Sequence, residues 1–231
     1  MSLSSNWRLV FPYEDTRQVV ALVQRTWDNL VEKKTPSFSP DAPEPHLTQF
    51  LQSVLKVEKI DAGLTGDFSA EVHVSDADLT TGQMKNRGRA DIRYFSDRVN
   101  LELTFEFKKI YPKGGSIKKY CGEDGMMRFV SGKYSRDQPL ALMVGLICND
   151  PETCISKIKS AIVNKKAAAE LRLAEIEPGK WLEEPTKELP PHVSFDSRHS
   201  RAHLDGRPDI LLCHLFLLYG DVAQQISSLK T

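Results

Sequence analysis

The chain has 231 residues, of which 40% are hydrophobic and 27% charged, and its formal net charge is zero. This composition is typical of an ordinary soluble globular protein, and the zero net charge argues against an autonomous, tight nucleic-acid binder. No charged segment followed by an apolar one opens the chain, and the longest apolar run, 210–219, is about half of a membrane span. The four cysteines lack metal-binding spacing, so we expect reduced thiols in a cytoplasmic protein.

The first half of the chain predicts two helices and a strand. Apolar residues at helical spacing indicate a helix over 15–33, and the four prolines of 35–45 indicate a loop. A second helix is expected over 44–58, because proline is acceptable at an early helical position. Residues 67–76 are expected to form a strand, followed by a glycine-rich and polar loop over 78–88.

The next two strands carry the most informative residues. Residues 89–95 indicate a short strand and 96–98 a turn, and 99–108 alternate between apolar and polar residues as a half-buried strand does. Glu106 and Lys108 therefore emerge from the polar face of that strand, roughly 7 Å apart along its axis.

The register of this hairpin decides whether Asp91, fifteen residues before Glu106, lies on the same face. If Ser96 pairs with Val99 across a two-residue turn, Asp91 lies opposite Thr104 on the polar face. A register shifted by one residue places it on the apolar face, unless a bulge intervenes. We expect the first register.

The second half of the chain predicts a helix, a buried strand and further elements. A helical stretch begins at about Ser116, is interrupted at 121–125 and resumes over 126–132. The continuous apolar run 140–147 is typical of a strand buried on both faces, and 151–176 is expected to be one helix.

The last part of the chain is expected to extend the same sheet or to form a small cap. Residues 175–191 indicate a loop or connector, and two strands follow, joined by a turn at Asp205-Gly206. Residues 221–231 are expected to be a tail or helix.

The segment Gly88-Arg89-Ala90-Asp91, followed by a turn and a strand ending in Glu106-Phe107-Lys108, resembles the core of the PD-(D/E)XK (restriction-endonuclease-like) nuclease superfamily. The resemblance covers about 44–147, and Ala90 stands where the family name has proline. It implies an α/β (α+β) fold with an αβββαβ core and a mixed central sheet flanked by helices. We expect a single domain over 1–231, with the helix 15–33 before the core and a C-terminal strand extension over 190–231.

The residue types suit metal-dependent hydrolysis of phosphodiesters. Asp91 and Glu106 offer the hard oxygen ligands that Mg²⁺ prefers, with Mn²⁺ as a substitute. The resemblance adds the backbone carbonyl of Phe107, and it implies a further acid from the first core helix, for which Glu44 is the candidate and Glu71 the competitor. Lys108 is expected to orient or deprotonate a water, or to stabilise developing negative charge.

Basic residues flank this constellation and indicate contacts with nucleic acid, with DNA favoured. Between positions 85 and 119 the chain has ten basic residues against four acidic ones. The alternative is an ordinary solvated surface. The candidates for phosphate contact are Lys109, Lys113, Lys118, Lys119 and Arg128; Lys133 and Tyr134 are further residues that could face substrate.

The pattern around the histidines favours structural roles over metal binding. His73 and His214 alternate with apolar residues and are expected to be hydrogen-bonded strand histidines. His199 and His203 have a spacing that chelates metal only on a helix, and their segment indicates strand and loop. A contact of 199–201 with phosphate or a partner is the other interpretation.

No nucleophile elbow, P-loop or dinucleotide-binding glycine motif is present. The leading hypothesis is a metal-dependent nuclease, directed by a helicase or other ATPase partner in a prokaryotic restriction or anti-phage system, as the resemblance implies. The alternative is a non-catalytic nuclease-fold subunit that serves in assembly or DNA docking.

Overall fold

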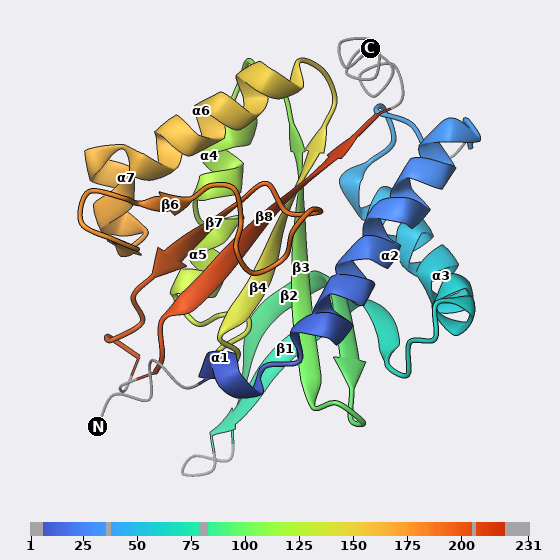
Figure 1. Ribbon diagram of the computed structural model, residues 1–231, viewed down its shortest axis with the longest axis horizontal. Coiled ribbons are helices and arrows are strands. Elements are labelled where there is room, and N and C mark those ends of the chain that lie inside the picture. The colour runs from blue at the N-terminus through green and yellow to red at the C-terminus, as the bar shows by residue number, and fades with distance from the viewer. Residues whose placement is uncertain (1–6, 36–37, 79–82, 205–206, 220–231) are drawn as a thin grey trace.

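A mixed eight-stranded sheet runs through the protein and carries helices on both faces (Figure 1). The computed structural model describes residues 7–35, 38–78, 83–204 and 207–219, without the side chains of 73–88. The order of the sheet is β1-β2-β3-β4-β8-β7-β5, with β6 paired to β7. The strands are β1 Asp67–Asp78, β2 Gln83–Ser96, β3 Leu101–Ile110, β4 Leu140–Ile147, β5 Leu173–Ala174, β6 Leu182–Glu183, β7 Phe195–His199 and β8 Ile210–Leu218.

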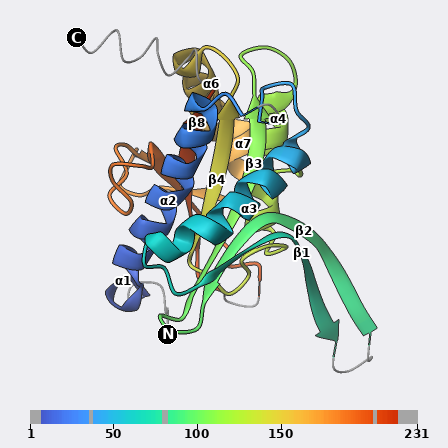
Figure 2. The same ribbon diagram turned by 90° about the vertical axis from the view of Figure 1, so that its right-hand side faces the viewer.

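The helices form two layers, one on each face of the sheet (Figures 1 and 2). The long helices α2 (Tyr13–Glu32) and α3 (Glu44–Asp61) cover one face, and the short α1 (Trp7–Val10) precedes them. The other face carries α4 Ser116–Cys121, α5 Met126–Val130, α6 Pro151–Val163 and α7 Lys165–Glu170.

Each helical layer buries its own hydrophobic core against the sheet. In β4, Leu142 and Val144 pack toward α2 and α3, whereas Ala141 and Met143 pack toward the opposite layer. All eight residues of β4 are buried, which confirms the prediction from its continuous apolar sequence. The pairs β3–β4 and β4–β8 are parallel, and β1–β2, β2–β3 and β7–β8 are antiparallel. The expected mixed sheet flanked by helices is therefore present.

Two predictions about the elements were wrong. Most of the expected loop 78–88 is strand, because β1 and β2 support each other through a ladder that extends to Asp78↔Gln83. The expected single helix 151–176 ends at Val163, where Asn164 adopts an extended ψ and begins α7 as its N-cap. The expected extension of the same sheet by the C-terminal strands is confirmed, because β8 pairs with β4 and β7 pairs with β8. The expected turn Asp205-Gly206 and the segment 221–231 lie outside the described residues.

The expectations about cysteines can be compared with the structure as well. All four cysteines are free thiols.

Within the described part of the chain, no helix combines the length and the apolar character needed to cross a bilayer.

Buried polar side chains form a chain of hydrogen bonds beneath α4. Tyr120 Oη lies 2.8 Å from His214 Nδ1, and Ser197 Oγ lies 2.8 Å from both His214 Nε2 and His199 Nε2. His199 Nδ1 lies 2.8 Å from the Leu171 carbonyl oxygen, so this nitrogen must carry a proton. His214 is thus a hydrogen-bonded strand histidine, as predicted. The side chain of His73 lies outside the described residues.

The interpretation of 199–201 as a phosphate or partner contact was wrong. His199 and Arg201 are fully buried. The Arg201 guanidinium donates to the carbonyl oxygens of Ser135 and Arg136, each at 2.8 Å. Its role is to hold the segment between α5 and β4 onto the sheet.

We expect acid to destabilise the fold through His199. Burial lowers the pKa of His199 to about 4, whereas the value in an unfolded chain is about 6.5. Between these values the unfolded state binds a proton that the native state does not, so the free energy of unfolding decreases as the pH falls through this window. The loss at pH 4 is about 3 kcal/mol, at 1.36 kcal/mol per pKa unit. The measurement is urea unfolding at a series of pH values.

His199→Gln should flatten this pH dependence, and the exposed His46→Gln should leave it unchanged. Equal slopes for wild type and His199→Gln would contradict the assignment.

Candidate active site

The hairpin of β2 and β3 brings the two predicted acids together. Its ladder runs from Ser96↔Leu101 to Ile92↔Phe105, so Asp91 and Glu106 follow directly after the last pair. The predicted pairing of Ser96 with Val99 was wrong by two residues, because the connection contains four residues, 97–100, instead of two. A shift of two residues preserves the face on which a side chain lies, so the expectation that Asp91 shares a face with Glu106 survives.

The β2–β3 ladder ends where the two acids stand. Beyond it, β2 continues with β1 as a two-stranded arm that projects from the body (Figure 2). The backbone amide of Phe107 donates instead to Asp91 Oδ2 at 2.8 Å. The Asp91 carboxylate thus takes the place of a ladder partner at the point where the strands separate.

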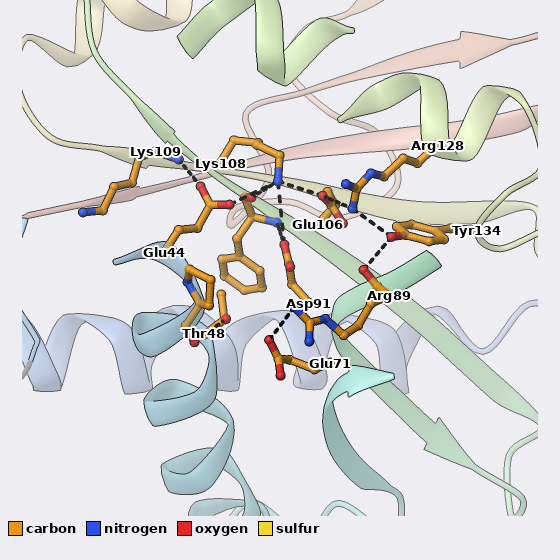
Figure 3. A network of polar contacts seen from close by, with 12 residues as sticks. Glu44, Thr48, Glu71, Arg89, Asp91, Glu106, Lys108, Lys109, Arg128 and Tyr134 are labelled. Atoms are coloured by element: carbon orange, nitrogen blue, oxygen red, sulfur yellow. Dashed lines mark hydrogen bonds and ion pairs between the residues drawn. The ribbon is translucent and has the colours of Figure 1, made fainter. Parts of the chain in front are cut away.

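The Lys108 ammonium lies among the oxygens that the sequence predicted as metal ligands (Figure 3). Its Nζ is 2.7 Å from both Glu106 Oε1 and the Phe107 carbonyl oxygen. It is 3.2 Å from Glu44 Oε1 and 3.9 Å from Asp91 Oδ2. Oxygens of three carboxylates and one carbonyl therefore converge on a single cation.

The first turn of α3 supplies Glu44 to this cluster. Glu44 Oε2 accepts a hydrogen bond of 2.8 Å from the backbone amide of Lys109, which joins the helix to β3. The Lys109 ammonium donates to the carbonyl oxygens of Pro40 and Ala42. Lys109, predicted as a phosphate contact, thus holds the segment that leads into α3.

The competitor for the Glu44 position points elsewhere. Glu71 Oε1 lies 3.1 Å from Arg89 Nη2. Its φ of 51° is in the left-handed region, and it has no partner in the ladder between Ala70↔Ile92 and Val72↔Ala90. Glu71 therefore marks a local irregularity of the hairpin opposite Asp91.

Glu106 is the most deeply buried acid of the cluster, with none of its surface exposed. Two cations contact its Oε1, Lys108 at 2.7 Å and Arg128 at 3.0 Å. Its Oε2 is buried and has no hydrogen-bond partner among the described residues. Burial raises the pKa of Glu106 to about 8, and the Asp91 carboxylate adds to this effect, against the opposing influence of the two cations.

The charges of the cluster balance only when one of its carboxyls carries a proton. Three carboxyl groups face two side-chain cations, so one negative charge is in excess when all three are ionised. The raised pKa of Glu106 means that this group takes up a proton near neutral pH. Burial also raises the pKa of Asp91. For Lys108, burial alone would lower the pKa, but Glu106, Asp91 and Glu44 together raise it. An additional positive charge would reduce the electrostatic repulsion between the carboxylates.

A cavity of about 550 Å³ opens beside the cluster. Glu44, Lys108 and Arg128 line it from the side of the acids, and Ser116 and Lys119 line it from α4. Lys119 is exposed at this cavity, and Lys113 and Lys118 are exposed on the same segment. The predicted basic surface therefore adjoins the predicted acids.

Arg128 does not project freely toward solvent. Its Nη1 donates to Glu106 Oε1 at 3.0 Å and to the hydroxyl of Tyr134 at 2.8 Å (Figure 3). Sequence reasoning proposed both residues as substrate contacts and missed that they contact each other and that Arg128 contacts Glu106. The spacing of residues in the sequence does not predict a contact between a helix residue and a residue of the following loop.

The described side chains are not arranged as a ready metal-binding site. In residues 7–35, 38–78, 83–204 and 207–219, no group of three or more acidic, histidine or cysteine side chains is placed to hold an ion. The Lys108 ammonium contacts all three carboxylates, so a metal could join them only if Lys108 moved aside.

Comparison of the chain with family models, with curated proteins and with solved structures finds no significant match.

Removing the Lys108 charge should destabilise the protein. In Lys108→Met, the buried Glu106 loses one of its two cations, and breaking a buried ion pair in this way costs about 3–5 kcal/mol. Urea unfolding at pH 7 measures the change. Lys118→Met, an exposed lysine in α4, should change the free energy of unfolding by less than about 0.5 kcal/mol. Equal effects of the two variants would show that Lys108 is not part of a buried charge cluster.

Proposed function

We propose that the protein is a metal-dependent nuclease whose active site is the cluster around Lys108. The observation that carries the proposal is the convergence of oxygens from Asp91, Glu106, Glu44 and the Phe107 carbonyl at the end of the β2–β3 ladder. Carboxylate and carbonyl oxygens are the ligands that Mg²⁺ and Mn²⁺ prefer. Together with the resemblance of 88–108 to the PD-(D/E)XK nucleases, this arrangement supports phosphodiester hydrolysis.

Two features of the cluster fit a divalent cation. The buried Oε2 of Glu106 has no hydrogen-bond partner among the described residues, and the carboxylates outnumber the cations that face them. Asp91, Glu106, Glu44 and the Phe107 carbonyl would hold the ion once Lys108 has moved toward the cavity. Bound Mg²⁺ would lower the pKa of a water and polarise the scissile phosphate.

The remaining residues have roles that follow from their positions. Lys108 lines the cavity, so its ammonium is placed to orient the attacking water or to stabilise negative charge on the phosphate. Lys119 lines the same cavity from α4, and Lys113 and Lys118 are exposed nearby. These lysines would hold the nucleic-acid backbone by sequence-independent electrostatics.

The alternative is a non-catalytic subunit with a nuclease-like fold. That alternative requires Asp91 to lie away from Glu106, whereas both carboxylates contact the Lys108 ammonium. The geometry therefore favours the enzyme.

DNA as the substrate, a helicase or ATPase partner and a role in prokaryotic restriction or anti-phage defence are proposed from the resemblance. The zero net charge of the chain agrees with targeting by a partner.

The test of the proposal is Mg²⁺- or Mn²⁺-dependent cleavage of circular DNA, linear DNA and RNA. Glu106→Gln and Lys108→Ala should each reduce the rate at least about 100-fold, since each removes a group in contact with the reacting atoms. Glu102→Gln is the matched control, because Glu102 lies on the same strand and pairs with Arg93 at 2.8 Å outside the cluster. Folded wild type that neither cleaves nor binds metal would refute autonomous catalysis and favour the alternative.

Glu44 gives a separate prediction about metal affinity. Glu44→Gln should raise the Mn²⁺ concentration at half-maximal cleavage by about 10-fold or more, the size of effect seen when metal-site partners are removed. Asp61→Asn, at the other end of α3, should leave this concentration unchanged. If Glu44→Gln needs the same Mn²⁺ concentration as the wild type for half-maximal cleavage, Glu44 is not a metal ligand.

A further inference from the structure

Tyr134 links the two strands that carry the acids. It is 1% exposed and lies in the segment between α5 and β4. Its hydroxyl accepts a hydrogen bond of 2.8 Å from Arg128 Nη1 and donates one to the carbonyl oxygen of Arg89 (Figure 3). One buried oxygen thus contacts groups from two separate parts of the protein.

Each of these contacts leads to one of the acids. Arg89 stands two residues before Asp91 on β2, and Arg128 donates to Glu106 Oε1 on β3 at 3.0 Å. The path from β2 to β3 therefore runs from the Arg89 carbonyl through the Tyr134 hydroxyl and the Arg128 guanidinium to Glu106. It crosses the gap just beyond Ile92↔Phe105, the last pair of the ladder.

Few contacts hold the strands together beyond that pair. The Phe107 amide donates to Asp91 Oδ2, and Lys108 contacts both acids. A two-stranded ribbon such as the β1–β2 arm is only marginally stable by itself. The position of Asp91 relative to Glu106 therefore depends on contacts of side chains, and any metal bound between them would depend on the same contacts.

Tyr134 is suited to this task because its surroundings are rigid. Its ring packs edge-on against Phe129, with ring centroids 5.9 Å apart, and the Arg128 guanidinium lies 5.3 Å from its centroid. The next residue, Ser135, is held through its carbonyl by the buried Arg201. The hydroxyl is therefore placed by a packed core and not by a mobile loop.

We propose that Tyr134 is a positioning residue that fixes the separation of Asp91 and Glu106 and holds Arg128 on Glu106. Where it concerns cleavage, this inference rests on the proposed nuclease function. Where it concerns the geometry of the two strands, it can be tested without any activity.

The geometric test is hydrogen exchange at the Phe107 amide, measured by NMR. This amide donates to Asp91 Oδ2, so its protection reports whether Asp91 stays at β3. In Tyr134→Phe its exchange should accelerate by about 10-fold or more through local opening. Tyr94→Phe is the matched control, because it removes a buried hydroxyl on β2 that accepts from the Gly66 amide at 2.9 Å. The control should leave Phe107 exchange unchanged.

The functional readout is the metal requirement. In Tyr134→Phe, the Mn²⁺ concentration at half-maximal cleavage should rise by about 10-fold, and saturating Mn²⁺ should recover most of the rate. A variant that had merely lost folded protein would show a lower rate with an unchanged metal requirement. If Tyr134→Phe does not fold, Arg128→Gln tests the same path with the same expected acceleration at Phe107.

The possible outcomes separate the two proposals. Unchanged Phe107 exchange in Tyr134→Phe, or equal acceleration in the Tyr94→Phe control, would overturn the positioning role. Accelerated exchange at Phe107, together with a wild type that neither binds Mn²⁺ nor cleaves, would support the positioning role and refute autonomous nuclease activity.

Discussion

The site depends on the point at which β2 stops pairing with β3. Up to Ile92↔Phe105 the backbone ladder sets the distance between the strands. Beyond it, the Asp91 carboxylate accepts the hydrogen bond of the Phe107 amide, and the strand continues into the arm. The separation opens room at the end of a rigid sheet, and the cluster of charges occupies that room. The geometry of a side-chain cluster is best fixed by such rigid elements.

The buried charges of this cluster are difficult to explain as a means of stabilising the fold. Taking charges out of water is expensive, and buried ion pairs often contribute less than apolar side chains of the same volume. Here Glu106 is fully buried, two cations contact the same oxygen, and its other oxygen has no hydrogen-bond partner among the described residues. A cluster of carboxyls whose pKa values are raised by burial, beside a cavity, is typical of functional sites. The same arrangement explains why Lys108 is both a stabilising counter-ion and a candidate participant in hydrolysis.

Local patterns were reliable where a residue's environment follows from its neighbours in the chain. The periodicity of α2 and α3 and the apolar run of β4 predicted elements that the structure contains. The length of the strand 83–96 was underestimated, because its polar first half gives no apolar alternation and forms a strand through pairing with β1. The hairpin register was wrong by two residues because a four-residue turn closes as well as a two-residue one, yet alternation preserved the face of Asp91.

The sequence by itself determined the types of the site residues and which face of β3 carries Glu106 and Lys108, because strand alternation is a local property. Tertiary structure decided what these residues contact. Glu44 joins the cluster because α3 begins beside the end of β3, where the Lys109 amide donates to its carboxylate. Tyr134 reaches Arg89 and Arg128 through packing of distant segments, and β8 lies inside the sheet because β4 offers a free edge for parallel pairing. Contacts between residues far apart in the chain leave no local periodic signal, so only the folded structure reveals them.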